Sequence, residues 1–529
     1  MVLVEVELWR IARMSFPLAI LFDVYSLVFL RAVTLITLRV LSFRYSYIGS
    51  SSGFSKFHLL VITFVASIII LILRPNLVTL ILGWDGLGIS SFFLVIFYKS
   101  NKAFNAGLLT ALTNRLGDAL ILISFTILWS FPSFTISLAS LSSLTTSQFM
   151  VFILIIAART KSAQVPFRAW LPAAMAAPTP VSALVHSSTL VTAGVYLLFR
   201  LAPMFKFSKL FLLVGALGAV TSIIASFAAL LEADLKKIVA LSTLSQLGVI
   251  VLRLRLGLPV LAFFHLVVHA FFKALLFIAT GNIIHNSNDY QDLRRNGGSA
   301  QVLPFTQATV ILTKLRLCGL PFFSAFYSKE WVLEGLRRGR QVNLWVYFII
   351  WAGVGLTALY SLRFIYYTIQ HSRLSSLFWK EDTDIRINLA KILLVIPRVI
   401  AGKLLLPCLA DFLLFPAVSF ISKLFVLSLL FIVAPLLFTW LSFSPFFSLL
   451  KSMFYLFFLR RWRGRGPLRL LSHTSFSLNW RSRFGWKDYL RRRGLFLMAK
   501  NRTPWVFFSS SRFLKAMAVV VLVFRLWIF

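Results

Sequence analysis

Long apolar runs, separated by short polar connections, dominate the sequence. The stretches 59–73 and 424–440 contain almost no strongly polar side chain. A helix needs about 20 apolar residues to cross a bilayer, and a backbone in lipid must satisfy its own hydrogen bonds, which favours helices. We therefore predict helices near residues 17–41, 56–74, 76–98, 106–131, 147–165, 180–200, 209–231, 238–257, 259–284, 303–320, 325–336, 344–370, 386–410, 417–441 and 512–529.

Two places in this pattern indicate interrupted helices. Four prolines crowd the first place, at Pro166, Pro172, Pro178 and Pro180. Gly319 and Pro321 interrupt the second. Proline removes a backbone donor and disrupts a helix, and in membranes such breaks survive where they are buried in protein or line a wet cavity. In transporters, breaks of this kind mark the transport site.

The composition supports the membrane assignment and argues against a nucleic-acid partner. Of 529 residues, 59% are hydrophobic, and the 54 Lys and Arg far outnumber the 16 Asp and Glu. Such an excess can indicate nucleic-acid binding. Here many basic residues lie in connections, which is typical of loops held on one side of a membrane. We therefore predict no nucleic-acid partner, and the Arg-rich stretch 460–502 could lie on anionic lipid.

No metal, disulfide or cofactor motif competes with this interpretation. Cys318 and Cys408 stand in apolar surroundings without paired spacing, so no disulfide or metal framework follows. We find no dinucleotide fingerprint, phosphate loop or cysteine cluster for iron–sulfur. His265 and His269, at i and i+4, could hold a metal geometrically, but no carboxylate or thiolate accompanies them. We predict no metal and no cofactor on this chain.

Ionisable residues stand inside or beside several apolar runs. Asp85 and Asp118 lie within such runs. Lys161 precedes the first break, His186 follows it, and Lys329 follows the second break. A charge at mid-membrane costs at least about 2.5–3.5 kcal/mol, so such groups are rare and usually face a partner or water. All five residues are therefore candidates for a functional site.

Three further candidates share one face of a single predicted helix. His265, His269 and Lys273 stand at i, i+4 and i+8, which spreads them over about 12 Å at about 1.5 Å per residue. Burial disfavours the charged form of a lysine or carboxylate, whereas a nearby opposite charge favours it. Histidine has an ordinary pKa close to neutral pH and needs no such neighbour to exchange protons there. Residues of these types at intervals are the components of a proton relay.

Each candidate also has a structural interpretation. Arg115 and Asp118, at i and i+3, could form a simple ion pair. Lys273 could extend its amine to a lipid headgroup, and a single histidine could merely bridge two helices. Asp23 is isolated in the sequence and carries no prediction. The relay is favoured because the ionisable residues recur in successive helices and cluster at the breaks.

Several segments of the chain resemble one protein family closely. They are GWDGLG (83–88), NRLGD (114–118), FYSKE (326–330), and residues 161–196, 234–248 and 269–277. They resemble the family of mitochondrial NADH–ubiquinone oxidoreductase chain 5, the antiporter-like proton-pumping subunits of respiratory complex I. The resemblance is dense from about residue 76 to 335 and looser elsewhere.

The resemblance implies an all-α polytopic membrane protein with about 14–16 transmembrane helices. These would form two inverted antiporter-like repeats, each with a broken helix, followed by a C-terminal lateral helix and an anchor helix. The implied divisions are N-terminal membrane helices, a proton-translocating core, C-terminal membrane helices, and a lateral amphipathic segment with the terminal anchor, at residues 1–75, 76–335, 336–416 and 417–529.

The resemblance also assigns roles to the ionisable residues. It implies one proton relay made of Asp85, Asp118, Lys161, His186, Lys236, His265, His269, Lys273 and Lys329. Within it, Asp85 and Lys161 would be the key carboxylate–lysine pair, and Lys236 enters the set through the resemblance alone. The family's pattern is not followed everywhere: Lys314 and Arg316 stand before the second break, where neutral residues are usual.

The implied function is proton translocation by a multi-pass core subunit of NADH:ubiquinone oxidoreductase, in the mitochondrial inner membrane. Electrons would pass from NADH to ubiquinone in other subunits, which would hold the NADH, FMN, iron–sulfur clusters and ubiquinone. The expected partners are the other membrane-arm subunits, especially the adjacent antiporter-like ones, and membrane lipid such as cardiolipin. A subunit of a multi-subunit sodium/proton antiporter is the alternative, because both groups share the central motifs.

Overall fold

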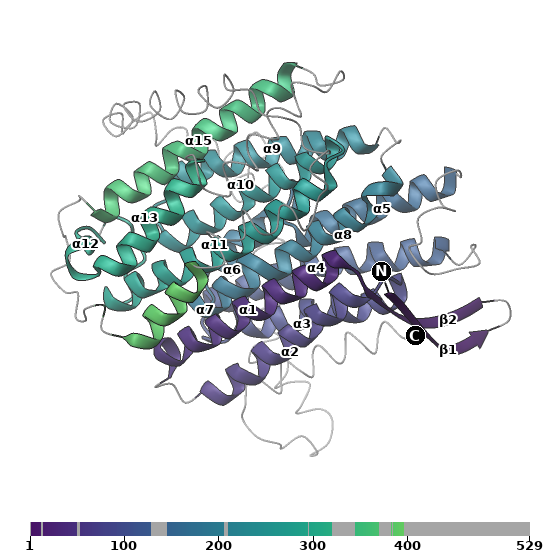
Figure 1. Ribbon diagram of the computed structural model, residues 1–529, viewed down its shortest axis with the longest axis horizontal. Helices are drawn as coiled ribbons and strands as arrows, with labels where there is room; N and C mark the ends of the chain where they lie inside the picture. Colours follow the sequence, from purple (N-terminus) through teal and green to yellow (C-terminus); the bar gives the residue numbers. More distant parts are fainter. Residues whose placement is uncertain are drawn as a thin grey trace, which may run out of the picture. The chain divides into compact units, whose positions relative to one another are not determined.

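The computed structural model describes residues 2–11, 14–49, 53–128, 145–205, 210–294, 296–319, 344–369, 382 and 384–395. Most of these residues lie in long helices that run side by side (Figure 1). The helices are α1 (Val24–Ile48), α2 (Phe54–Leu73), α3 (Leu77–Val95), α4 (Asn101–Leu128), α5 (Thr145–Lys161), η1 (Phe167–Ala169), α6 (Trp170–Ala174), α7 (Thr179–Val181), η2 (Ser182–Thr189), α8 (Leu190–Phe205), α9 (Leu210–Leu231), α10 (Leu235–Arg255), α11 (Pro259–Asn286), α12 (Ser299–Val302), α13 (Pro304–Cys318) and α15 (Leu344–Ile369).

Consecutive helices pack in antiparallel order because their connections are short. Residues 74–76 join α2 to α3, residues 232–234 join α9 to α10, and residues 256–258 join α10 to α11. The two helices of each pair contact each other, as expected when a short loop places a helix beside its predecessor. Among the described residues, 7 helices are long and apolar enough to cross a membrane.

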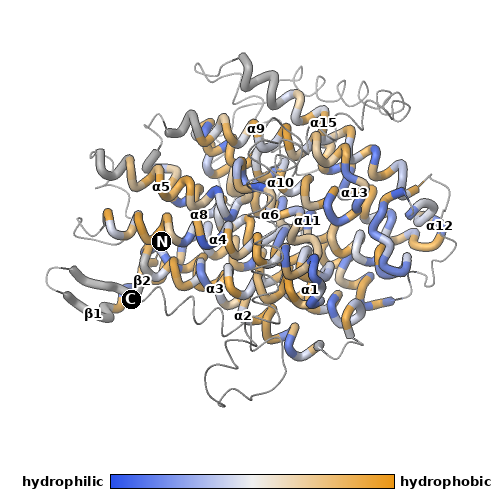
Figure 2. Tube along the Cα trace, turned by 180° about the vertical axis from the view of Figure 1, so that it is seen from behind, coloured by the Kyte–Doolittle hydropathy of each residue, from blue (hydrophilic) through white to orange (hydrophobic). Residues whose placement is uncertain are grey.

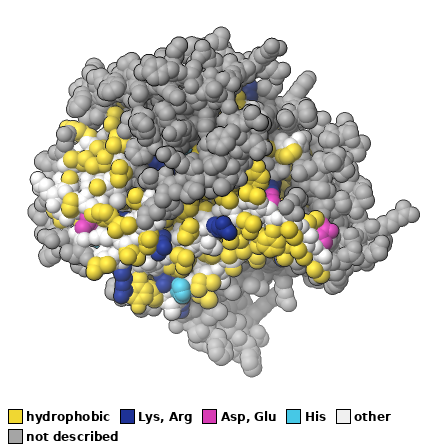
Figure 3. All heavy atoms as spheres, in the orientation of Figure 1, with side chains coloured by type: hydrophobic (Ala, Val, Ile, Leu, Met, Phe, Trp, Pro, Cys, Tyr) yellow, Lys and Arg dark blue, Asp and Glu magenta, His cyan; other side chains and the backbone are white. Residues whose placement is uncertain are grey.

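Burial separates central helices from outer ones. The apolar windows of the spans Thr179–Pro203 and Pro259–Asn286 are completely buried, whereas 28% of the apolar window in Asn101–Ile127 is buried. The outer helices expose leucines such as Leu59 and Leu82. Figure 2 shows hydrophobic residues along these helices, and Figure 3 shows hydrophobic side chains over a face of the described part. Contiguous apolar surface of this kind marks contact with membrane or protein, so the outer helices suit a lipid environment.

The N-terminal end differs from the prediction. Val2–Ile11 (β1) and Met14–Phe22 (β2) form a two-stranded antiparallel hairpin. The helix predicted at 17–41 is therefore wrong at its start, because α1 begins directly after Asp23. The Asp23 side chain accepts a hydrogen bond from the backbone nitrogen of Ser26 at 2.7 Å and completes a capping box, which fixes a helix start.

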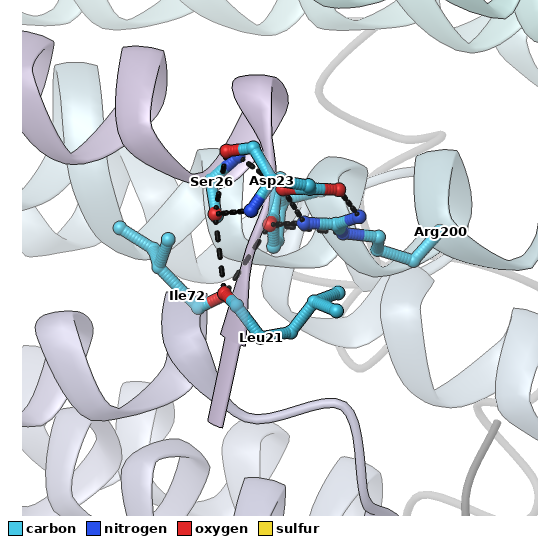
Figure 4. Close-up of polar contacts among 6 residues, drawn as sticks. Leu21, Asp23, Ser26, Ile72 and Arg200 are labelled. Atoms are coloured by element: carbon cyan, nitrogen blue, oxygen red, sulfur yellow. Dashed lines mark hydrogen bonds and ion pairs between the residues drawn. The ribbon is translucent and has the colours of Figure 1, made fainter. Parts of the chain in front are cut away.

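Asp23 also ties the start of α1 to α8 (Figure 4). Its two carboxylate oxygens accept hydrogen bonds from the Arg200 guanidinium at 2.5 and 3.0 Å. Arg200 Nε donates to the Tyr196 hydroxyl at 2.9 Å, and Tyr196 donates to the carbonyl oxygen of Ile72 in α2 at 3.3 Å. Burial alone would raise the pKa of Asp23, but the hydrogen bonds and charge of Arg200 hold it below its ordinary value. The contacts join three helices.

The first interrupted helix lies where the prolines predicted it. Helix α5 ends at Lys161, and the short segments η1, α6 and α7 carry the chain past the prolines until η2 and α8 continue. Segment η2 is a π-helix, a form found frequently at functional sites. Gly194 of α8 permits a close approach to this break, because a Cβ there would overlap the Ala158 carbonyl oxygen and the Ser162 nitrogen.

The second interruption starts as predicted. Helix α13 ends at Cys318, and Gly319 follows with φ 92°, a left-handed conformation that favours glycine. The helices predicted at 325–336, 417–441 and 512–529 lie outside the described residues, as does the rest of the predicted lateral segment. The predicted helices that fall on described residues are present, and the all-α polytopic fold class is confirmed apart from the hairpin.

Candidate functional site

The two predicted carboxylates share one arginine. Asp85 lies near the middle of α3, while Arg115 and Asp118 lie about one turn apart on α4. Arg115 Nη1 is 3.7 Å from Asp85 Oδ2 and 3.4 Å from Asp118 Oδ2. The Arg115 side chain is 46% exposed, whereas that of Asp118 is 9% exposed. The ion pair of the structural interpretation therefore exists, but Arg115 also reaches a second carboxylate on another helix.

Lys161 lies beside these carboxylates, at the end of α5. Its side chain is fully buried, and Nζ donates to the Trp84 carbonyl oxygen at 2.5 Å. The amine is also 3.9 Å from the centre of the Trp84 ring. Lys161 interacts electrostatically with Asp118 and Asp85. The structure therefore gathers three predicted site residues, and with Arg115 they form what we call the acid–lysine cluster.

Close contact between α4 and α5 holds this cluster together. A Cβ on Gly117, the residue before Asp118, would overlap the hydroxyl of Thr160, the residue before Lys161. Trp170 of α6 donates from Nε1 to the Thr160 carbonyl oxygen at 2.9 Å. Trp170 is not among the predicted site residues, and its place inside the proline-rich segment is the signal that the sequence offers for it. The Gly117 contact lets the carboxylate and the amine approach each other.

His186 lies beside Trp170. It belongs to the π-helix η2, is 1% exposed, and has its ring centre 6.1 Å from that of Trp170. Neither ring nitrogen makes a hydrogen bond to a described residue. No described hydrogen bond therefore joins His186 to the acid–lysine cluster or to the histidines of α11. Buried nitrogens of this kind are usually satisfied by ordered water.

The three candidates on α11 do face one side of that helix. His265, His269 and Lys273 are all fully buried, and the two imidazole centres are 6.2 Å apart. Lys273 Nζ donates to the Ser242 hydroxyl of α10 at 2.6 Å. Lys273 therefore points into the protein, and the headgroup interpretation is wrong. Within the described ranges, no three His, Cys, Asp or Glu side chains are grouped as metal ligands.

Two buried arginines lie beside this face of α11. Arg253 of α10 is fully buried and interacts electrostatically with His269. Arg316 of α13 is 1% exposed, and its guanidinium carbon is 5.3 Å from the centre of the Phe272 ring. The sequence shows both as charges within apolar segments, but it did not indicate that they lie near the histidines. Because arginine stays protonated in proteins, both supply positive charge beside the predicted relay.

Lys236 lies apart from the other candidates, at the start of α10. Its Nζ donates to the Ala177 carbonyl oxygen at 3.3 Å, and it interacts electrostatically with Asp289. A pocket of about 450 Å³ opens here, lined by Ser100, Lys102, Ala176, Asp289, Tyr290, Gln291 and Asp292. Lys236 therefore lies next to a polar opening in the described surface. Lys329, the remaining candidate, lies outside the described residues.

The sequence is similar to one family of membrane proteins. A family profile described as NADH:quinone oxidoreductase/Mrp antiporter, transmembrane, matches residues 75–357. NADH-ubiquinone oxidoreductase chain 5 of Aedes aegypti is 45% identical over 69% of this chain and 63% of its own length. The corresponding protein of Locusta migratoria is 43% identical over 75% of this chain and 70% of its own length.

Two solved structures of membrane complexes contain chains with a similar fold. A chain of the Mrp complex from Dietzia sp. DQ12-45-1b matches with a TM-score of 0.75 and 25% identity, over 99% of this chain and 57% of that one. A chain of the archaeal membrane-bound sulfane sulfur reductase matches with a TM-score of 0.66 and 20% identity, over 74% of this chain and 81% of that one. Among the chain-5 relatives, this chain spans 63% of the length of the Aedes aegypti protein and 70% of that of the Locusta migratoria protein.

Proposed function

We propose a function for this chain on the premise that it belongs to the NADH:quinone oxidoreductase/Mrp antiporter family of transmembrane proteins. The chain acts as a core membrane subunit of NADH:ubiquinone oxidoreductase and moves protons across the mitochondrial inner membrane. Oxidation of NADH and reduction of ubiquinone take place on partner subunits, which hold FMN and the iron–sulfur clusters. The names of the chain-5 relatives, together with the buried ionisable residues, support this proposal.

The acid–lysine cluster at the helix break is the observation that carries the proposal. Lys161 is fully buried, and its electrostatic partners Asp85 and Asp118 lie on two other helices. Burial disfavours a charged amine, whereas nearby carboxylates favour it. A small movement of the carboxylates relative to Lys161 therefore changes how strongly the amine holds a proton. The exposed Arg115 interacts with both carboxylates and can compete with Lys161 for them.

The histidines supply intermediate positions for the proton. All three predicted histidines are buried: His186 lies in η2, and His265 and His269 lie in α11. Lys273 follows the last two along α11. Imidazole can donate from one nitrogen while it accepts at the other, and it exchanges protons readily near neutral pH. The free nitrogens of His186 and His269 suit hydrogen bonds to water. We assign these residues to proton transfer between the acid–lysine cluster and the second broken helix, where Lys329 would continue the path.

The pocket beside Lys236 supplies an aqueous opening to the path. Asp289 lies in the pocket wall and interacts electrostatically with Lys236, so its charge acts on protons that approach the lysine. Replacing Asp289 by Asn should slow proton translocation several-fold, because the charge is lost while the shape is kept. Asparagine suits the left-handed backbone at this position, where φ is 61°. The rate of NADH-driven proton translocation in sealed vesicles measures the effect.

The control for this variant is Asp384→Asn. Asp384 is also an exposed carboxylate, but it does not line the pocket. We expect the control to translocate protons at the rate of the unaltered complex. An Asp289→Asn complex that translocates protons at that same rate would remove the pocket from the proton path.

A sodium/proton antiporter subunit is the second candidate function. It is favoured by the fold similarity to a chain of the Mrp complex, which covers 99% of this chain. The two functions differ in their energy source. A redox pump needs NADH and quinone, whereas an antiporter exchanges protons for sodium without either.

Sealed vesicles that contain the assembled complex separate the two functions. We expect NADH with quinone to drive proton translocation in sodium-free buffer, and a sodium gradient alone to move no protons. Subunits that copurify should include proteins carrying flavin and iron–sulfur clusters. Proton movement driven by sodium without NADH, with no redox subunit in the preparation, would replace the first function by the second.

A further inference from the structure

A fully buried lysine of α13 lies outside the predicted relay. Lys314 is in α13, and its Nζ makes no hydrogen bond to any described residue. The amine lies 3.8 Å from the centre of the Phe364 ring and 5.8 Å from that of Tyr360, both on α15. The sequence marks this position as unusual, because neutral residues are usual there in the resembled family. Lys314 is thus a buried basic group that the proposed path does not use.

The surroundings of Lys314 contain hydroxyl and thiol groups. Cys318, one turn further along α13, interacts electrostatically with Lys314, and its sulfur is 2.7 Å from the Ser361 hydroxyl. The Tyr360 ring faces the amine from α15. Arg316, which is on α13 like Lys314, lies against Phe272 of α11. Among the described residues, no carboxylate lies within ion-pair distance of Lys314. Aromatic rings are therefore the main contacts that favour its charged form.

Lys273 contacts a hydroxyl on α10, and Lys314 lies beside the ring of a tyrosine on α15. Tyr360 packs in one cluster with Leu241 of α10, and its phenol interacts with the side chains of Ser242, Ser245 and Gln246. The hydroxyl makes no direct hydrogen bond to a described residue, and buried oxygens of this kind are usually satisfied by ordered water. Ser242 in turn accepts the hydrogen bond from Lys273 Nζ at 2.6 Å. Lys273 and Ser242 are therefore joined directly, whereas water can bridge Ser242 to Tyr360 and Tyr360 to Lys314, because the Tyr360 hydroxyl and the Lys314 amine have no partner among the described residues. Each of these side chains can donate or accept a proton.

Lysine is suited to this position only if it can lose its charge. A cation held at such depth is costly when, as among the described residues here, no carboxylate accompanies it. Arginine would remain charged, whereas a buried lysine releases its proton readily. The two aromatic rings stabilise the charged form in part, so that neither form is excluded by the surroundings.

We propose that Lys314 is a further proton-carrying residue of this chain, linked to Lys273 through Ser242, Tyr360 and bridging water. In the transfer, Lys273 gives a proton to the Ser242 oxygen, and Ser242 passes its own proton to a bridging water, which gives one of its protons to the Tyr360 oxygen. Tyr360 then passes its proton through a second bridging water to Lys314 Nζ. Both hydroxyls end neutral, no bond between heavy atoms changes, and one positive charge moves from Lys273 to Lys314. This inference rests on the proposed function of the chain.

Three substitutions in the assembled membrane complex test the inference. Lys314→Met removes the exchangeable proton, Lys314→Arg keeps a charge that cannot be released, and Lys314→His restores an exchangeable group. We expect the Met and Arg variants to lower NADH-driven proton translocation about 100-fold, the lower end of the effect of removing a proton-transfer group. The His variant should recover translocation, with its pH profile moved towards neutral pH because histidine titrates there.

The outcomes separate this inference from the proposed function. Native gels first establish assembly, and loss of assembly in all three variants would assign Lys314 a structural role and overturn the inference. Full translocation by the Arg variant would mean that a fixed charge suffices, and full translocation by the Met variant would mean that no charge is needed; either result also overturns it. Lys161→Met is measured in parallel, because an effect there without one at Lys314 rejects this inference alone.

Discussion

Replacing Lys161 by Met is expected to lower NADH-driven proton translocation about 100-fold or more, the smallest effect expected for loss of a positioned proton-transfer group. The substitution keeps most of the side-chain volume, so the packing around the break is retained. It removes the amine that interacts with Asp85 and Asp118. The two carboxylates then keep Arg115 as their only cationic partner in the acid–lysine cluster.

Proton translocation per NADH oxidised, in sealed vesicles, measures this effect. Electron transfer from NADH to a soluble artificial acceptor should be unchanged, because it takes place on partner subunits. The control is Lys56→Met, which removes an exposed lysine near the start of α2 and should leave translocation unchanged. A Lys161→Met complex that translocates protons with full yield would contradict the proposed function.

Breaking the contact between Asp23 and Arg200 is expected to have the largest effect on stability. Either Asp23→Asn or Arg200→Met leaves one ionic partner without its counterpart in a site where the side chains are 15% and 23% exposed. Removing one partner of a buried ion pair costs about 3–5 kcal/mol, and the partial exposure here places the expected cost near the lower end. Heat inactivation of the assembled complex measures the loss.

The double variant, Asp23→Asn with Arg200→Met, is the matched control. It leaves no uncompensated charge, so it should be more stable than either single variant. Because Arg200 lowers the pKa of Asp23, the stabilisation is present above the ordinary carboxyl pKa of 3.8 and is lost as the pH falls through the lowered value. Equal stability of all variants at neutral pH would show that the contact does not hold α1 to α8.

Helices and breaks could be predicted from the sequence where a local property decides them. Apolar runs of membrane-spanning length leave the backbone no alternative to internal hydrogen bonds, and the prolines near Pro166 prevent one continuous helix. The hairpin at 2–22 was missed because its second strand reads as the apolar beginning of a membrane helix. Its boundary depends on the cap formed by Asp23 and Ser26.

Part of the site could be predicted because it, too, depends on a local property of the chain. The spacing of His265, His269 and Lys273 fixes their common face, since helix geometry is local. The sequence did not show that Arg115 is shared by Asp85 and Asp118, because Asp85 lies on a different helix. The roles of all these residues in proton transfer remain predictions, and their positions are what the structure supplies.

By itself, the sequence determined that this protein crosses a membrane in many helices, that two of them are broken, and that ionisable residues lie inside them. Only the tertiary structure decided which of those residues meet. Lys161 finds its partners across three helices, Asp23 pairs with an arginine 177 residues away, and Lys273 of α11 donates to a hydroxyl on α10. The physical reason is that hydrophobicity and backbone hydrogen bonding act along the chain, whereas a buried charge depends on neighbours that packing brings from elsewhere.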